Sequence, residues 1–360
     1  MGEKIEIRTL LKAAVQMGAS DLHLTVQRPP QARVAGELVS IPELELLTPD
    51  DCQRLAYELL NDTERKTFEQ EKEIDLSYGV SGLGRFRINL YFQRGSVGAS
   101  IRALPYSIPS FKELGLPEKT MAHLAVLPYG LILVSGPTGS GKTTTMASII
   151  EYINQERSVH IISIEDPIEY LYHHKKSTVA QREIGSDTTS FARALRHVLR
   201  QDPNVILIGE IRDPETARAA LRIAETGHLV ISTVHSGEVV QVMSRIVDMF
   251  PASEQNEIRV SLSLTLRAII VQQLIPRKGK AGRVLATEMM LSTPGIQNLI
   301  REGKYNQIYT QIQLGGGESM HTMNSSLHRL YLEGQIEEEI MFKHSSTPKE
   351  LKALLKEGRA

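Results

Sequence analysis

The sequence predicts an α/β protein with a smaller N-terminal α+β domain and a larger domain built on a parallel sheet. In the first 104 residues, short segments of alternating apolar and polar residues are interspersed with helical segments. From residue 131 onward, apolar runs of four to six residues alternate with amphipathic helices, which is typical of parallel strands joined by helices. A chain of 360 residues has room for two domains.

The N-terminal elements have recognisable boundaries. Gly18 is a suitable stop for the first helix, and Thr48 followed by Pro49 is a suitable start for the second. Glycines at positions 79, 82 and 84 separate two alternating segments, which indicates a hairpin. We expect helices at 7–17, 48–60 and 62–71, and strands at 19–25, 33–38, 75–78, 85–91 and 97–104.

Two prolines follow the alternating segments of the N-terminal domain. Pro105 and Pro109 favour an interdomain linker at residues 105–116, between a domain at 1–104 and a core at 117–292. A C-terminal helical region at 293–360 follows the core. Within the core we expect strands at 131–134, 160–164, 205–208 and 229–234, and helices at 117–127, 144–150, 187–200 and 214–226.

A glycine-rich loop follows the first apolar strand of the core and precedes a helix. The loop matches the pattern G-x-x-x-x-G-K-[ST], and it consists of Gly136, Pro137, Thr138, Gly139, Ser140, Gly141, Lys142 and Thr143, with Thr144 next in the helix. In such a loop, backbone N–H groups and the helix N-terminus surround a phosphate. We expect Lys142 to reach the terminal phosphates of a nucleoside triphosphate and the Thr143 hydroxyl to ligate Mg²⁺.

Acidic residues follow two other predicted strands. Glu165, Asp166 and Glu169 come after the strand at 160–164, and Glu210 comes after the strand at 205–208. Ligands of parallel sheets bind beyond the carboxyl ends of the strands, so these acids are expected near the phosphates. Glu210 has the position of a Walker B acid near Mg²⁺. Glu169 is favoured as the base that activates water, with Glu165 as the alternative.

A histidine follows the strand at 229–234. His235 is expected to contact the γ-phosphate or to relay its state to a neighbouring domain. His228 precedes the same strand, and it is open whether this residue is functional or only interacts with a helix terminus.

Arginines are frequent in the predicted N-terminal hairpin and the strand after it. Arg85, Arg87, Arg94 and Arg102 could form a charged outer face of a small sheet. Beside a nucleotide hydrolase, an arginine that reaches a neighbour's γ-phosphate is a serious alternative, since such a residue can accelerate hydrolysis roughly a thousandfold or more.

The composition of the chain argues against several classes of protein. A formal net charge of −1 argues against a nucleic-acid-binding protein. The single cysteine, Cys52, excludes an intramolecular disulfide and a cysteine zinc cluster, and it fits a reducing compartment. No segment has about 18 consecutive apolar residues, and the N-terminus lacks a signal-peptide core. We expect a soluble, cytoplasmic protein.

Four motifs, in this order along the chain, resemble those of the secretion ATPases. Among the secretion ATPases, the chain resembles the twitching-motility retraction ATPases of type IV pili. The four motifs are the phosphate loop, the acidic segment 164–169, the segment 209–213 and the histidine segment 227–235. The resemblance covers nearly the whole chain, including residues 19–24 and the arginine-rich hairpin. Retraction motors carry Ala-Ile-Arg-Asn-Leu-Ile-Arg-Glu, and residues 295–302 stand in its place, with Gly295 and Gln297 at the first and third positions.

The resemblance implies a cytoplasmic homo-hexamer that hydrolyses ATP with Mg²⁺ and uses domain closure to drive pilus disassembly. Each chain would pair a PAS-like domain at 1–104 with a RecA-like domain at 117–292, and ATP would lie at a subunit boundary. Lys142, Thr143, Glu169 and Glu210 take the family's roles, and the N-terminal arginines approach the nucleotide. The implied partners are the pilus platform protein of the inner membrane, with which the motor associates peripherally at the pilus base, and other pilus machinery such as the extension ATPase.

Three alternatives stay open. The first is a pilus-extension or type II secretion ATPase of the same fold, although those relatives usually carry a tetracysteine zinc insert that this chain lacks. The second is a nucleic-acid translocase, which the near-neutral charge disfavours. The third is a regulatory ATP-binding module with little turnover.

Overall fold

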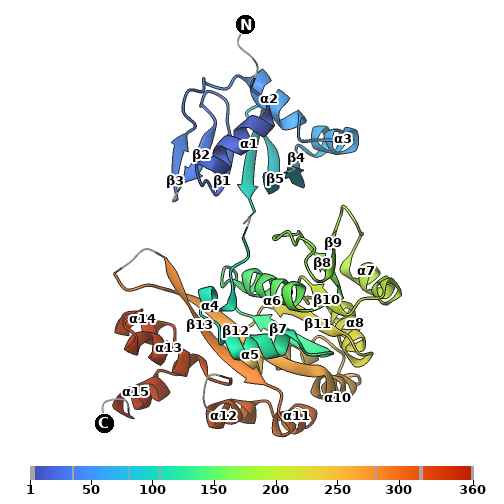
Figure 1. The fold of residues 1–360 in the computed structure, drawn as a ribbon, viewed down its shortest axis with the longest axis vertical. Coiled ribbons are helices and arrows are strands. Elements are labelled where there is room, and N and C mark those ends of the chain that lie inside the picture. Colours follow the sequence, from blue (N-terminus) through green and yellow to red (C-terminus); the bar gives the residue numbers. More distant parts are fainter. Residues whose placement is uncertain are drawn as a thin grey trace. The chain divides into compact units, whose positions relative to one another are not determined.

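The chain forms two compact units in a computed structural model that describes residues 5–34, 36–80, 82–104, 107–279, 282–315 and 319–357. One unit comprises Met1–Ser107 with Glu169–Leu171, and the other comprises Ile108–Ile168 with Tyr172–Ala360 (Figure 1). Each unit has its own sheet. The predicted fold class, an antiparallel N-terminal sheet domain followed by a mainly parallel sheet domain, is confirmed.

The N-terminal unit is built on a six-stranded antiparallel sheet in the order β3-β2-β1-β6-β5-β4. The strands are β1 (Asp21–Leu24), β2 (Gln31–Val34), β3 (Glu37–Ser40), β4 (Glu73–Val80), β5 (Gly84–Gln93) and β6 (Ser96–Ala103). The helices are α1 (Ile7–Gln16), α2 (Pro49–Tyr57) and α3 (Asp62–Glu71). On one face Leu22, Ile88 and Ile101 are buried in a core with Leu10 of α1 and Leu55 of α2. The other face carries polar side chains.

The helix boundaries follow from their caps. Thr48 Oγ1 accepts the Asp51 backbone N–H while the Asp51 carboxylate accepts that of Thr48. Asn61 and Glu64 form the same reciprocal pair at the start of α3, which spans the predicted residues. Helix α2 ends at Tyr57 rather than at the predicted residue 60, because its last turn tightens to i→i+3 bonds such as Leu60 N–H to Tyr57 O.

The second unit contains a seven-stranded sheet in the order β13-β12-β7-β11-β10-β8-β9. The strands are β7 (Gly130–Ser135), β8 (His160–Glu165), β9 (Thr178–Glu183), β10 (Val205–Ile208), β11 (Leu229–Val234), β12 (Leu266–Pro276) and β13 (Arg283–Leu291). All neighbours pair in parallel except β12 and β13. The chain passes from β7 to β8 across the positions of β11 and β10. Such a reversal of strand order opens a crevice at the carboxyl ends of the strands.

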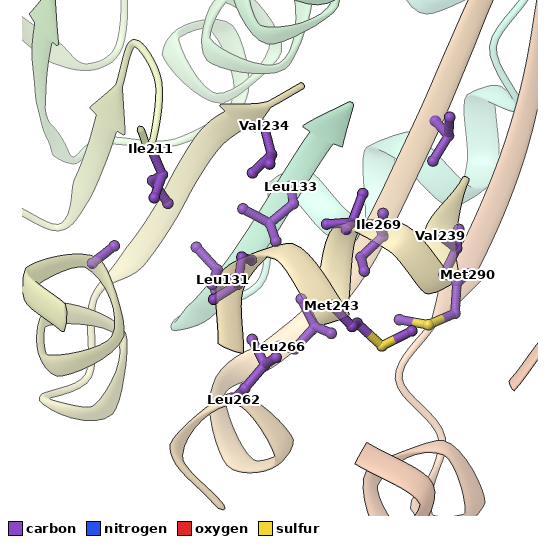
Figure 2. Packing of buried hydrophobic residues seen from close by; sticks show 14 of the residues in the cluster. Leu131, Leu133, Ile211, Val234, Val239, Met243, Leu262, Leu266, Ile269 and Met290 are labelled. Carbon is purple, nitrogen blue, oxygen red and sulfur yellow. The ribbon is translucent and has the colours of Figure 1, made fainter. Parts of the chain in front are cut away.

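Helices cover this sheet. Those predicted at 117–127, 144–150, 187–200 and 214–226 are present, whereas the helices at 239–248 and 255–265 were not predicted. The helices are α4 (Phe111–Leu114), α5 (Glu118–Ala125), α6 (Lys142–Glu156), α7 (Phe191–Val198) with the 3₁₀ turn η1 (Leu199–Gln201), α8 (Pro214–Glu225), α9 (Val239–Asp248) and α10 (Gln255–Thr265). Met243 of α9 and Leu262 of α10 belong to the same buried cluster as Leu131, Leu133 and Ile269 of the central strands (Figure 2). These helices therefore bury one face of the central strands.

Several elements differ from expectation. Residues 33–38, expected to form one strand, are divided between β2 and β3, and β9, β12 and β13 were not predicted. Helix α4 lies inside the predicted linker, where Ser110 and Glu113 form a capping box and Gly115 ends the helix with φ +76°. Helix α7 begins at Phe191 rather than at Asp187, because Ser190 is the N-cap and the Asp187 carboxylate instead accepts the Glu183 backbone N–H. The capping residues Ser110 and Ser190 are visible in the sequence, but they were not used to predict where these helices begin.

In the described part of the chain that follows β13, five further helices are present. They are α11 (Pro294–Arg301), α12 (Asn306–Leu314), α13 (Met323–Leu332), α14 (Glu338–Lys343) and α15 (Pro348–Glu357). The Glu350 carboxylate of α15 accepts hydrogen bonds from Tyr309 Oη at 2.5 Å and Asn324 Nδ2 at 2.9 Å, so α12 and α13 hold the last helix. Within the described part of the chain, no helix combines the length and the apolar character that a bilayer span requires.

Glu288 of β13 is a buried carboxylate in this core, with 2% of its surface exposed. Burial raises the pKa of Glu288 to about 7, and the nearby negative charges of Glu238 and Glu350 add to that effect. The backbone N–H of Val239, at the N-terminus of α9, donates to Glu288 Oε2 at 3.0 Å and acts in the opposite direction. Glu288 therefore joins β13 to α9, the helix that follows His235 in the chain.

Glu288 makes the stability of the protein depend on pH. Between about pH 4.5 and 7 the folded state retains a proton that the unfolded state loses, so the free energy of unfolding contributed by this group falls as pH rises through that range. Glu288→Gln removes the titration and still offers an oxygen to Val239. We expect this variant to be more stable than the wild type at pH 8.5, by on the order of 1–3 kcal/mol, with a smaller difference at pH 5.5.

Chemical denaturation at the two pH values measures this effect. The exposed Glu339 provides a matched control, because Glu339→Gln changes the same charge without burial. A wild-type protein and a Glu288→Gln variant with parallel pH dependence of stability would contradict the prediction.

Candidate functional site

The carboxyl ends of four parallel strands meet at one edge of the second unit's sheet. Ser135 at the end of β7 pairs with Val234 at the end of β11, and Ile208 at the end of β10 pairs with both Ser232 and Ile164. This register brings the phosphate loop, His235, Glu210 and Glu165 to the same edge, as the sequence predicted.

The phosphate loop connects β7 to α6, and its backbone has positive φ values that favour glycine. Gly139 and Gly141 have φ values of +76° and +88°, which side-chain-bearing residues rarely adopt. Lys142 is 9% exposed, and its Nζ donates to the carbonyl oxygens of Gly136 at 2.9 Å and Pro137 at 3.0 Å. The ammonium group is thus held over the loop at the N-terminus of a 15-residue helix, where an anion is stabilised.

Gly136 is required by the close approach of β12. A Cβ atom at this position would lie 2.4 Å from the backbone oxygen of Gln272 and 2.6 Å from Ser140 Oγ, and φ is +142°. The Gln272 side chain is 1% exposed, and its Nε2 donates to Thr145 Oγ1 at 3.0 Å and to the Ser140 carbonyl at 3.4 Å. Gln272 therefore supports the loop from the neighbouring strand. Sequence reasoning missed this residue, which lies about 130 positions further along the chain.

Ser135, directly before the phosphate loop, connects that loop to the residues on either side of His235. Its Oγ donates to the backbone oxygens of Ser236 at 2.7 Å and Val234 at 3.1 Å, and it accepts the Ser236 backbone N–H at 3.0 Å. The residue is fully buried. Sequence reasoning also missed Ser135, although a serine at the end of an apolar strand is visible in the sequence.

Glu210 lies at the centre of a short polar network. Its Oε2 is 3.2 Å from His235 Nε2, and its Oε1 pairs with Arg212. Thr233 Oγ1 donates to the Gly209 carbonyl at 2.8 Å and accordingly fixes the turn before Glu210. The side chain of Glu210 is 11% exposed, whereas that of Arg212 is 69% exposed. The carboxylate is therefore fixed, and its arginine partner can exchange with solvent.

The two histidines of the sequence motif lie at opposite ends of β11. His235 follows the strand, and Arg245 Nη1 of α9 donates to its backbone oxygen at 2.9 Å. His228 precedes the strand, and its Nδ1 lies 3.1 Å from the Ile223 carbonyl in the last turn of α8. Only His235 belongs to the site edge. His228 interacts with a helix terminus.

Glu165 and Glu169 have different environments. Glu165 is 4% exposed, and its Oε1 accepts hydrogen bonds from Ser163 Oγ at 2.6 Å and Gln181 Nε2 at 3.3 Å. Glu169 is half-buried and belongs to the short segment that groups with the N-terminal unit. The assignment of the water-activating base to either residue stays a prediction.

The predicted arginines occupy the N-terminal unit. Arg87 of β5 and Arg102 of β6 are directly opposite each other, and Arg94 is in the turn between these strands with φ +50°. Arg102 Nε donates to Asp21 Oδ1 at 2.8 Å. Their contact with a nucleotide also stays a prediction.

A cavity of about 480 Å³ adjoins the phosphate loop within the second unit. Gly141 and Thr144 form part of its lining, and Arg277, Arg283 and Arg329 add positive charge. This volume lies in the range of small-molecule pockets, and its position beside the loop offers space for the rest of a nucleotide.

A glycine-rich anion loop at the switch point of a mainly parallel sheet, with a carboxylate and a histidine at neighbouring strand ends, defines a P-loop nucleotide hydrolase. The family model described as "Type II/IV secretion system protein" matches residues 3–339. The type IV pilus retraction ATPase PilT of Pseudomonas aeruginosa is 44% identical over 337 residues, covering 93% of this chain and 96% of the relative. The type IV pilus ATPase PilU of the same organism is 37% identical, covering 98% and 92%.

A solved structure agrees with these relatives. The crystal structure of the pilus retraction motor PilT with bound ADP superimposes with a TM-score of 0.90 at 49% identity, covering 97% of this chain and 99% of that one. The chain belongs to the family of type II/IV secretion system proteins, and it is an ATP hydrolase of the PilT type.

Proposed function

We propose that this protein is the motor that retracts type IV pili, working as a cytoplasmic homo-hexamer on Mg-ATP. The observation that carries the proposal is the similarity to PilT across nearly the full length of both chains. The intact phosphate loop and the strand-end network support a working hydrolase. The platform protein of the inner membrane is the proposed partner to which the hexamer transmits force, at the pilus base.

The proposed roles follow the chemistry of the site. Lys142 and the loop N–H groups hold the phosphates, Glu169 activates the attacking water, and His235 responds to the γ-phosphate through Glu210. Arg87, Arg94 and Arg102 contribute positive charge from the N-terminal unit. Domain closure on ATP and release after hydrolysis then follow the logic of a switch held by the γ-phosphate.

Magnesium fits this site. Among the described residues, no group of three or more histidines, cysteines and acids could hold a metal. Mg²⁺ commonly takes one or two protein ligands and completes its shell with phosphate oxygens and water. Thr143, on the first turn of α6, and Glu210, with its exchangeable Arg212 partner, are the proposed protein contributions. The ion would neutralise charge on the phosphates.

Deletion of the gene in its own host tests the direction of force. We expect pili to persist on the surface while twitching is lost, and reintroduction of the wild-type gene to restore twitching. A gene carrying Lys142→Ala provides the negative control. Loss of pili after deletion would instead indicate an extension ATPase. ATPase activity that rises strongly with DNA or RNA would indicate a translocase.

An accessory motor is the second candidate, and a specific observation favours keeping it. PilU is 37% identical over almost the entire chain, and the signature at 295–302 departs from the retraction pattern. On α11, Ile296 and Ile300 are fully buried, whereas Gly295 is exposed and Gln297 is half-buried. The departures therefore alter a surface and leave the core intact. Steady-state hydrolysis by the purified protein without a second motor separates the candidates.

A further inference from the structure

A row of charged residues crosses the polar face of the N-terminal sheet. Asp21 of β1 is directly opposite Arg33 of β2 on one side and Arg102 of β6 on the other. Arg102 is in turn opposite Arg87 of β5. Directly opposed residues of antiparallel strands share a face, so three arginines and one carboxylate form a single row over four adjacent strands.

Asp21 holds one edge of the Arg102 guanidinium. The Asp21 side chain is 8% exposed, and its Oδ1 accepts a hydrogen bond from Arg102 Nε at 2.8 Å. Ser20 Oγ donates to Asp21 Oδ2 at 2.8 Å, and Arg33 Nε is 3.8 Å from the same oxygen. The carboxylate is therefore oriented by groups on both sides.

The other edge of Arg102 remains available. The Arg102 side chain is 68% exposed although its Nε is bonded to a buried carboxylate. The two terminal nitrogens together carry four N–H donors, and this is the edge that forms two parallel bonds to a phosphate. Among the described residues, the hydrogen bond and the ion pair of Arg102 are both made by Nε with Asp21.

Charge also favours this arrangement. Arg102 and Arg87 are opposed like charges, which repel each other, and Asp21 offsets that repulsion from the other side of Arg102. Burial raises the pKa of Asp21, but hydrogen bonds from Ser20 and Arg102 and the charge of Arg102 together bring it below its usual value. Asp21 is thus ionised at neutral pH.

We propose that Asp21 is a positioning residue for Arg102, which it holds by Nε so that the terminal nitrogens meet a phosphate oxygen of the nucleotide. The inference rests on the proposed function, since it takes Arg102 as a nucleotide contact. Holding a long side chain in its bound conformation lowers the entropy lost when the phosphate arrives. In this proposal Asp21 acts only through Arg102.

A double-mutant cycle on the full-length assembled protein tests this inference. We expect Arg102→Ala and Asp21→Ala each to lower kcat by about 10-fold or more. In the Arg102→Ala background, Asp21→Ala should lower kcat less than about 2-fold further, because the residue through which it acts is gone. Asp75→Asn, a carboxylate on the exposed part of the same face, is the matched control and should leave kcat within about 2-fold of the wild type.

Thermal unfolding separates positioning from a purely structural role. If Asp21 had only a structural role, Asp21→Ala would lower Tm and the active fraction equally in the wild-type and Arg102→Ala backgrounds. Equal losses of kcat in these two backgrounds would overturn the inference. If the alanine variant does not fold, Asp21→Asn, which keeps the shape, takes its place in the same cycle. Full activity of the Asp21 variants beside a defective Arg102→Ala would overturn this inference alone, whereas lack of hydrolysis by the wild type would overturn the proposed function.

Discussion

Replacing Lys142 with alanine is expected to lower the rate of ATP hydrolysis by at least about 100-fold, the largest effect of any single change in the loop. Lys142 Nζ is held by two loop carbonyl groups at 2.9 and 3.0 Å, so its charge is already placed where the terminal phosphates are expected. Alanine removes this charge from a site that is 9% exposed, where solvent screens electrostatic interactions less than at the surface.

The measurement is steady-state release of phosphate by the purified variant, with nucleotide affinity measured separately. Thermal unfolding establishes that the variant is folded. Lys119→Ala provides a control, because it removes the same charge from an exposed position on α5. Hydrolysis that survives Lys142→Ala would mean that the loop is not the catalytic phosphate site.

Local patterns predicted most of the fold. The phosphate loop lies between β7 and α6 as expected, because strand, glycine-rich turn and helix are all encoded within about 25 consecutive residues. The acidic and histidine segments also lie at strand ends. Parallel strands align their carboxyl ends, so Glu210 and His235 were predicted to converge without knowledge of the strand order.

The supporting residues of the site could not be predicted in the same way. Gln272 is a buried polar residue of β12, and its partners Ser140 and Thr145 lie about 130 positions earlier. Only the pairing of β12 with β7 brings them together, and no local pattern encodes that pairing. The link between Asp21 and Arg102 spans 81 positions and depends likewise on the pairing of β1 with β6.

Short-range signals explain the boundary errors. The capping box Ser110–Glu113 identifies α4 from sequence, but the two prolines that precede it, Pro105 and Pro109, suggested only a linker. At α7, the prediction placed the start of the helix at Asp187, whereas Ser190 caps the helix. In both cases a specific side-chain-to-backbone hydrogen bond sets the helix boundary.

Glu169→Gln is expected to lower ATP turnover by about 10²–10⁴-fold while nucleotide binding is retained, since a general base contributes a factor of this size. Glutamine keeps the shape of the side chain but cannot accept a proton from water. Glu165→Gln should have a much smaller effect, because Glu165 is 4% exposed and its Oε1 is already engaged by Ser163 and Gln181.

The pair of variants distinguishes the two candidates for the base. Both change one carboxylate to an amide within five residues of each other, so each serves as the matched control for the other. Single-turnover hydrolysis with saturating ATP separates chemistry from binding and product release. If Glu165→Gln abolishes turnover while Glu169→Gln retains it, the base is Glu165, and its bonds to Ser163 and Gln181 then orient a catalytic carboxylate and do not merely satisfy a buried one.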